Sequence, residues 1–259
     1  MDRIVKAKDF YDSLSHHYHL LYQNWEMTIE QQSSALDRLI QSFHHDRTEP
    51  ILDCACGIGT QAIGLAALGY TVTATDISSK AIARAAREAR RRHLAKIQFK
   101  VADMRRLAAV SGFLFPIVIC CDNPLAHLLD LEEVNQAARS IHSVMRPGGL
   151  LLFSGRDYEK ARTERPTQAS FRHRTIEGRM TIVFQIWEWE SQRPIYTNDH
   201  FILQQTSSGW KIAESRTKMR AHTQAEIAAQ FRKTGFTRIH WHSPATTGYF
   251  QPIMSAVRK

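Results

Sequence analysis

The sequence lacks the long apolar run that a membrane-spanning helix requires and the leader that marks a secreted protein. No stretch of the 259 residues approaches the ~20 consecutive apolar residues needed to cross a bilayer. The N-terminus, MDRIVKAKDFYDS, carries charges from its second residue and has no apolar core followed by small residues. We therefore expect a soluble, cytoplasmic protein without a membrane partner.

Cysteine is also scarce, since the chain has only four. They form a C-x-C and an adjacent pair inside apolar runs: Cys54, Cys56, Cys120 and Cys121. This is neither the scatter of a disulfide framework nor the spacing of a zinc site, and it is typical of small core residues in a reducing compartment. Of the 13 histidines, five could be gathered into a metal site: His16, His17, His19, His44 and His45. Their spacings fit surface helix positions better, so we predict no metal.

Acidic residues are outnumbered, which gives the chain a formal net charge of +9. Clustered basic residues bind phosphate and nucleic acid. The densest cluster, residues 84–92, lies on a helical repeat whose other face is apolar, so it is typical of the solvated side of a helix packed on a sheet. We expect a small-molecule substrate rather than a nucleic acid, and the sequence leaves monomer and homodimer both open.

Residues 50–156 alternate short apolar runs with amphipathic stretches, which is typical of βαβ units around a parallel sheet. The expected strands are Ile51–Cys56, Thr71–Thr75, Ile97–Val101, Pro116–Cys121 and Leu150–Ser154. The expected helices are Thr60–Leu68, Ser79–His93 and Leu131–Met145. Pro147-Gly148-Gly149 is expected to end the last of these helices and lead into the fifth strand.

After Arg156 the pattern changes to consecutive β-rich runs without helices between them, which should pair antiparallel. These runs are Arg179–Glu190, Tyr196–Gln205 and Trp210–Thr217, and a helix at Gln224–Lys233 and strands near Thr237–His242 and Gln251–Val257 follow. We predict an α/β fold with a doubly wound, mostly parallel, seven-stranded sheet, an antiparallel β insertion after strand five and an N-terminal helical lid. The expected parts are 1–45 (lid), 46–156 (ligand-binding core), 157–220 (insert on the substrate side) and 221–259 (C-terminal helix and strands).

A glycine turn follows the first expected strand, in the segment Ile51-Leu-Asp-Cys-Ala-Cys-Gly-Ile-Gly-Thr-Gln-Ala62. Gly57 and Gly59 allow the backbone to approach a ligand closely. This pattern alone also fits a dinucleotide site, because Asp76 lies about 20 residues on, where such a site carries its ribose-binding acid.

Four carboxylates argue against a dinucleotide as the ligand. They are Asp53, Asp76, Asp103 and Asp122, and each follows one of the first four strands, at the edge where open α/β sheets bind ligands. Asp53 would repel a pyrophosphate. S-adenosylmethionine is a net cation, which the four acids attract. We therefore predict this cofactor, with S-adenosylhomocysteine as its product, although any one of these acids could equally be a helix cap or turn residue.

Three of the four acids have an expected partner on the cofactor. Asp53 lies beside the methionine ammonium, Asp76 can accept both ribose hydroxyls, and Asp103 with Met104 can hold the adenine.

At these segments the sequence resembles the class I S-adenosylmethionine-dependent methyltransferases, and within them the glycine and glycine/sarcosine N-methyltransferase family. LDCACGIGT and ATDIS are similar to the first two motifs, VADM to the adenine-contacting turn, and MRPGGLLLFSGRDY to the stretch around strand five. CDNPLAHLLD resembles the family's C-x-N-x-x-A-H-L segment, and residues 11–25 resemble the segment that closes over cofactor and substrate. The cofactor contacts predicted from the motifs and the strand-end acids are Tyr18, Trp25, Asp53, Ala55, Cys56, Gly57, Gly59, Asp76, Ile77, Asp103, Met104 and Cys120.

The family holds a substrate carboxylate with an asparagine and an arginine, which by resemblance are Asn123 and Arg156 here. The sequence departs from the family at two places. Gln31-Gln32 stands where relatives often carry an arginine for the cofactor carboxylate, and Asp122-Asn123-Pro124 replaces a smaller, neutral turn. The resemblance therefore does not carry glycine over as the acceptor.

Methyl transfer is an in-line substitution that needs alignment and exclusion of water rather than a covalent nucleophile. The candidate catalytic residues are Asn123, Arg156 and His127, with His127 or His200 as a base. An aromatic wall can bind the cation that forms on an amine, although the same side chains could simply pack the insert on the sheet. The candidates are Trp187, Trp189, Tyr196, Tyr249 and Phe250, of which we assign Trp187, Tyr196 and Tyr249, with Asn123 and Arg156, to substrate binding.

These observations predict an enzyme that methylates a small molecule, at an amine nitrogen of an amino-acid-like or heterocyclic metabolite. Other functions stay open. Asp122-Asn123-Pro124-Leu125 partly resembles the loop by which base-amine methylases hold a flipped nucleic-acid base. The glycine turn also fits an NAD-type oxidoreductase, and a non-catalytic cofactor-binding protein would need the same residues.

Overall fold

The computed structural model describes residues 6–110, 112–176 and 178–259. Its larger sheet has seven strands in the order β10-β11-β5-β4-β1-β2-β3. Their bounds are β1 Ile51–Asp53, β2 Val72–Asp76, β3 Ile97–Val101, β4 Phe115–Cys120, β5 Met145–Ser154, β10 Phe236–His242 and β11 Ile253–Arg258. The pairs from β3 to β5 are parallel, and β11 runs antiparallel to both β5 and β10, so the predicted mostly parallel sheet is confirmed.

Helices cover both faces of this sheet because its strands are apolar on both sides. Leu52 and Val118 face one core with α5 (Leu131–Ser143). Their chain neighbours Ile51 and Ile117 face the other core with α2 (Trp25–Ser42) and α3 (Thr60–Ala67). Successive side chains of a strand point to opposite faces, and a sheet buried on both sides therefore reads as a continuous apolar run. The helices are α1 Ala7–Leu14, η1 Tyr18–Leu21, α2 Trp25–Ser42, α3 Thr60–Ala67, α4 Ser79–Arg91, η2 Pro124–His127, α5 Leu131–Ser143, α6 Glu159–Glu164, α7 Gln224–Lys233 and α8 Pro244–Thr247.

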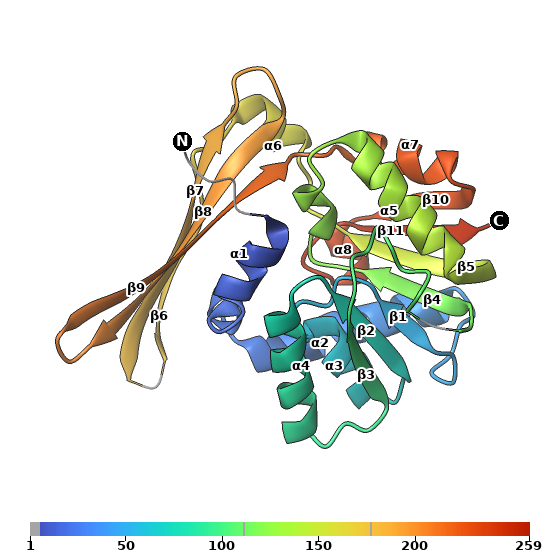
Figure 1. Cartoon of the computed structure of the whole chain (residues 1–259), viewed down its shortest axis with the longest axis horizontal. Coiled ribbons are helices and arrows are strands. Elements are labelled where there is room, and N and C mark those ends of the chain that lie inside the picture. The colour runs from blue at the N-terminus through green and yellow to red at the C-terminus, as the bar shows by residue number, and fades with distance from the viewer. Residues whose placement is uncertain (1–5, 111, 177) are drawn as a thin grey trace.

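A second, antiparallel sheet follows β5, as predicted. Its strands are β6 Gln168–Ile176, β7 Arg179–Trp189, β8 Ile195–Thr206 and β9 Gly209–Arg220, paired in chain order. Figure 1 shows this sheet as a long twisted ribbon beside the core, with α1 lying between the two. The helix α1 packs on β9 and α4, and Phe10 and Leu14 share a small apolar cluster with Val183 and Ile202 of the ribbon.

The structure corrects three local expectations. The short helix α6 and the strand β6 were not expected, because polar and basic residues interrupt the alternation of 159–176. The strand β1 ends at Asp53 rather than at Cys56. The helix α5 ends at Ser143, and Pro147-Gly148-Gly149 lies inside β5 at a register shift, where Gly148 has a φ of +76°.

The four cysteines are buried and free, which confirms that they are core residues. Within the described part of the chain, no helix is both long and apolar enough to cross a membrane.

Candidate functional site

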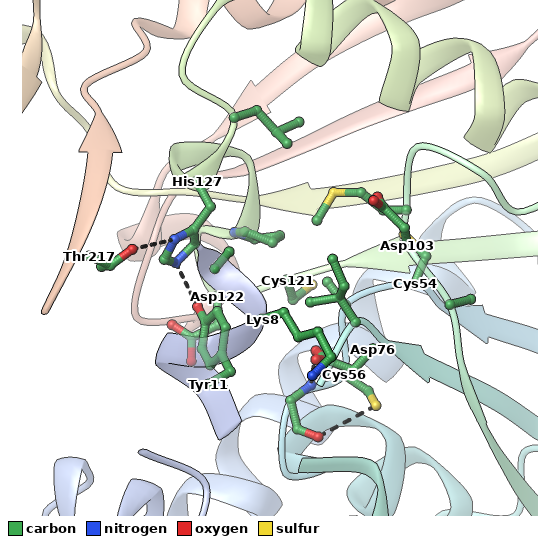
Figure 2. A pocket seen from close by; sticks show the side chains of 18 of the residues that line it. Lys8, Tyr11, Cys54, Cys56, Asp76, Asp103, Cys121, Asp122, His127 and Thr217 are labelled. Atoms are coloured by element: carbon green, nitrogen blue, oxygen red, sulfur yellow. Dashed lines mark hydrogen bonds between the residues drawn. The ribbon is translucent and has the colours of Figure 1, made fainter. Parts of the chain in front are cut away.

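A cavity of about 500 Å³, the first cavity, opens at the carboxyl edge of the large sheet. Figure 2 shows its labelled side chains, which come from the end of β2, from loops after the strands, from α1, from η2 and from β9. Of the residues predicted to contact the cofactor, the lining contains Tyr18, Ala55, Cys56, Gly57, Asp76, Ile77, Asp103 and Met104. The structure therefore brings together residues that lie far apart in the sequence, such as Tyr18 and Met104, which are 86 positions apart.

Asp76, the last residue of β2, is held by two backbone donors. Its Oδ2 accepts from Gly57 N at 2.9 Å and its Oδ1 accepts from Ser78 N at 2.8 Å. Gly57 has a φ of +53°, in the left-handed region, which lets its N–H turn toward this carboxylate. Burial raises the pKa of Asp76 to about 6, although the two backbone hydrogen bonds oppose that rise. The carboxylate is therefore fixed in orientation and keeps unoccupied lone pairs for a ligand.

Asp53 lies deeper and outside the lining of the first cavity. It is 1% exposed, and its Oδ1 accepts a long hydrogen bond of 3.4 Å from Ala55 N. Its Oδ2 is buried without a partner. Burial raises the pKa of Asp53 to about 8. A buried carboxylate with an unused oxygen costs folding energy, and such costs are concentrated at functional sites.

The substitution Asp53→Asn is therefore expected to stabilise the ligand-free protein at high pH. The folded pKa of about 8 lies above the ordinary value of 3.8, so the wild type carries no penalty below about pH 4, and the penalty grows until about pH 8. We expect the variant to gain on the order of 2 kcal/mol in free energy of unfolding at pH 8, after the cost of the buried amide, and progressively less at lower pH.

Urea unfolding of both proteins at pH 5 and pH 8 measures this difference. The control Asp157→Asn, at an exposed position, should stay within ~0.5 kcal/mol of the wild type at both values. A loss of stability at pH 8 in Asp53→Asn would show that Asp53 has a stabilising partner.

Asp103 is already paired in the structure. Arg105 donates to both of its oxygens, from Nε at 3.0 Å to Oδ1 and from Nη2 at 2.6 Å to Oδ2, and also contacts Glu133. Burial alone would raise the pKa of Asp103, but the hydrogen bonds from Arg105 outweigh it and lower the pKa. Its predicted contact with adenine stays a prediction and would have to use lone pairs that Arg105 leaves free.

A second, larger cavity of about 980 Å³ lies beside the first. It contains three of the predicted substrate-binding residues, Asn123, Arg156 and Tyr196. The two cavities share four lining residues, which therefore form the seam between them: Tyr11, Tyr18, Tyr22 and Asp122.

Asp122 is the charged member of the seam. It has a φ of +70°, which is rare for a residue with a side chain, and its N–H donates to Ser154 Oγ at 2.8 Å. Tyr22 donates its hydroxyl to Asp122 Oδ2 at 2.9 Å. Burial raises the pKa of Asp122, whereas Tyr22 and the charge of Arg156 oppose the rise. Strain at a half-buried carboxylate between two cavities is typical of a functional position.

Asn123 follows with a φ of +67° and connects Asp122 to the second cavity. Its Oδ1 accepts from Arg156 N at 3.1 Å and its Nδ2 donates to Tyr158 Oη at 2.8 Å. Arg156 in turn stacks on the ring of Trp187, with 4.7 Å from the guanidinium carbon to the ring centroid. Asn123 therefore positions Arg156 and keeps one amide N–H for a substrate.

His127 of η2 lines the first cavity beside the seam. The hydroxyl of Tyr11 lies 2.8 Å from Nε2 and the hydroxyl of Thr217 lies 3.4 Å from Nδ1 (Figure 2). Burial lowers the pKa of His127 to about 4. The imidazole is therefore uncharged at neutral pH and belongs to a hydrogen-bonded pair with Tyr11.

Several predicted residues lie outside the linings of both cavities. Trp25 packs behind the first cavity and donates from Nε1 to Thr60 Oγ1 at 2.9 Å, while Tyr249 is buried and bonded to Gln61 and Gln32. The ring of Trp187 contacts the guanidinium of Arg156 on one side and stacks on the ring of Tyr196. The predicted residues outside both linings are Trp25, Asp53, Gly59, Cys120, Trp187 and Tyr249.

Neither Tyr11 nor Tyr22 was predicted as an individual site residue, and Asp122 was predicted to attract the cofactor without a specific partner. Tyr11 and Tyr22 belong to the N-terminal stretch that resembles the family's closing segment, and Asp122 was seen only as a strand-end acid. Lys8 and Lys218 also line the first cavity, and no sequence pattern places them there. The hydrogen bond between Tyr22 and Asp122 is a tertiary contact, so the sequence alone does not predict the seam.

The comparisons with known proteins agree with this geometry. Residues 51–149 match a methyltransferase domain model. A putative methyltransferase of Bacillus subtilis, YqeM, is 36% identical over 103 residues, which are 40% of this chain and 40% of that protein. Glycine N-methyltransferase of Rattus norvegicus is 35% identical over 119 residues, or 42% of this chain and 41% of that protein. The chain thus spans about two fifths of the length of these curated relatives.

The fold extends the similarity over nearly the whole chain. An amino pentose methyltransferase from Micromonospora echinaspora, CalS10, solved with S-adenosylmethionine bound, superposes with a TM-score of 0.75. The match covers 94% of this chain and 95% of that chain at 18% sequence identity. At this identity the likeness concerns the fold, and it includes the ribbon beside the core.

Proposed function

We propose that this chain, which carries a class I S-adenosylmethionine-dependent methyltransferase domain, transfers a methyl group to an amine nitrogen of a small molecule. The observation that carries the proposal is the seam. A carboxylate, Asp122, and three tyrosines stand between a cavity suited to the cofactor and a larger cavity with room for an acceptor.

The residues of the first cavity fit S-adenosylmethionine, which is the cofactor of this domain class. Asp53 lies outside this lining but directly precedes Cys54 and Ala55, which belong to it. Its buried, unpartnered Oδ2 needs a donor, and the methionine ammonium, directly or through water, can supply one. The carboxylate of Asp76 is fixed by two backbone N–H groups and can accept the ribose hydroxyls. When bound, the cofactor supplies an electrophilic methyl group on a cationic sulfur.

The acceptor side requires a group that handles positive charge. An amine must present a free lone pair, and a cation forms on the nitrogen during transfer. Asp122 can hold the amine and take up its proton, because the pKa of this carboxyl is raised while Tyr22 fixes one of its oxygens. The uncharged pair of Tyr11 and His127 adds a polar wall without placing a second positive charge at the seam.

The N-terminal segment excludes water from the seam. Tyr11, Tyr18 and Tyr22 come from α1, η1 and the residues after η1, and Arg84 of α4 fixes this segment by donating to Ser15 O at 2.7 Å and His16 O at 2.8 Å. A dry, aligned contact between donor and acceptor is the main requirement of an in-line transfer.

A test uses the purified protein, cofactor with a labelled methyl group, and a panel of small primary amines, each paired with the alcohol of the same skeleton. We expect label to appear in amines and not in the paired alcohols, and calorimetry to show binding of S-adenosylmethionine and S-adenosylhomocysteine. Label in the alcohols alone would contradict the acceptor atom. Cofactor binding without transfer to any amine or alcohol of the panel would favour a cofactor-binding protein that is not an enzyme.

A further inference from the structure

The second cavity carries an excess of positive charge. Three arginines line it, Arg156, Arg172 and Arg174, and among the described residues of its lining Asp122 is the one carboxylate. Asp122 lies at the seam with the first cavity, whereas the three arginines line the second cavity alone. A basic wall inside a cavity of about 980 Å³ favours a ligand with a negative charge at a distance from the reacting nitrogen.

Two of these arginines form a pair on one strand. Arg172 and Arg174 are two residues apart in β6, so their side chains leave the same face about 7 Å apart at the backbone. Arg172 Nη1 donates to Leu21 O at 3.1 Å, and Arg174 Nη2 donates to Leu20 O at 2.5 Å. Neither forms an ion pair with a carboxylate of the described residues.

The pair therefore keeps charge and donors for a ligand. Each guanidinium has five N–H donors, and one is used by each backbone contact. Burial, and to a smaller extent the like charge of Arg172, lower the pKa of Arg174. An anion placed between them would relieve this repulsion, and guanidinium groups bind phosphate and carboxylate through paired hydrogen bonds.

Polar atoms of β8 point to further groups on the same ligand. Asn198 and His200 line the second cavity and are 2% and 6% exposed. Asn198 donates to His200 Nε2 at 2.9 Å, but Asn198 Oδ1 and His200 Nδ1 are buried without a partner. An unpartnered amide oxygen in a cavity requires a donor such as a hydroxyl group.

The volume of the second cavity is larger than an acceptor as small as glycine would fill. Cavities of 300 to 1,000 Å³ are typical of ligands the size of a drug or a substituted sugar. The relative named glycine N-methyltransferase is therefore a guide to the core of this chain and not to its acceptor.

We propose that the acceptor is a hydroxyl-bearing amine with a phosphate or carboxylate group, which Arg172 and Arg174 bind while the amine faces Asp122. This inference rests on the proposed function in one respect, namely that the second cavity is the acceptor site. The anion subsite itself can be tested without any methyl transfer.

The test is calorimetric titration of the ligand-free protein with inorganic pyrophosphate and, separately, with succinate, at constant ionic strength. We expect at least one of the two anions to bind the wild type at least tenfold more tightly than the variant Arg172→Gln/Arg174→Gln. The anion that binds distinguishes a phosphate from a carboxylate ligand. The variant Arg172→Lys/Arg174→Lys keeps the charges without the paired donors, and its affinity should fall between the two.

A matched control removes two charges from the same sheet outside both cavities. Arg179→Gln/Lys211→Gln, on β7 and β9, should bind the anion as the wild type does. Equal affinity in the wild type and in Arg172→Gln/Arg174→Gln, or an equal loss in the control, would overturn the anion subsite. Binding of S-adenosylhomocysteine, measured on the same samples, reports separately on the proposed function and should be unchanged in all four proteins.

Discussion

Replacing Asp76 by asparagine is expected to weaken the binding of S-adenosylmethionine at least a hundredfold. Both carboxylate oxygens accept backbone N–H groups, from Gly57 and from Ser78. In either orientation an asparagine amide would therefore place its NH₂ against one of these donors. The variant would disturb the glycine turn and also lose charged hydrogen bonds to the ribose hydroxyls, worth roughly 1.5 to 3 kcal/mol each.

Calorimetry with S-adenosylmethionine measures this effect, and a thermal melt of the ligand-free protein separates it from unfolding. Burial raises the pKa of Asp76 to about 6, so the folded state already bears a cost for this charge and the variant should still fold. The control Asp46→Asn changes the same group in the exposed loop before β1 and should leave affinity unchanged. An affinity within threefold of the wild type in Asp76→Asn would remove Asp76 from the cofactor site.

The seven-stranded sheet was predictable because its signal is local. Runs such as Ile117–Cys120 are apolar at every position, which is typical of strands buried on both faces, and each is followed by an amphipathic stretch or a turn. The acids at the strand ends then converge on one edge by topology alone. Asp76 and Asp103 could therefore be placed in one site from the sequence alone.

The ribbon was predicted less completely for a physical reason. The strand β6, which pairs with β7, carries polar and basic residues such as Arg172 and Arg174. The two faces of β6 border a cavity and solvent rather than an apolar core. A strand without a buried apolar face has no alternation to detect. The same residues that hid β6 from the pattern are the ones that line the second cavity.

The seam could not be derived from the sequence, because it depends on the position of the N-terminal segment over the core. Tyr22 and Asp122 are 100 residues apart, and nothing in either segment specifies their hydrogen bond. The left-handed backbone of Asp122 and Asn123 is equally invisible, since aspartate and asparagine only tolerate this conformation. Asp122 thus looked like one more strand-end acid rather than the charged group between two cavities.

The substitution Asp122→Asn is expected to lower kcat at neutral pH at least a hundredfold with little change in cofactor affinity. Asparagine tolerates the left-handed backbone at this position and keeps an oxygen that can accept from Tyr22, so the fold of the turn should survive. The variant loses the negative charge that holds the amine and accepts its proton, and a positioned base contributes about 10² to 10⁴ in rate. The measurement is the pH dependence of kcat for the best amine of the panel.

The pH profile distinguishes a role of Asp122 in proton uptake from a role in orienting the acceptor. At alkaline pH the amine is already neutral in solution, so activity of Asp122→Asn should recover toward the wild type as pH rises to about 10, near the ordinary range of amine pKa values. The control Asp157→Asn removes an exposed carboxylate beside Arg156 and should follow the wild-type profile throughout. If Asp122→Asn is equally impaired at every pH, Asp122 serves to orient the acceptor, and the proton leaves by another route. If it is unimpaired at neutral pH, the amine reaches the seam already neutral, and the carboxylate between the two cavities has no part in the reaction.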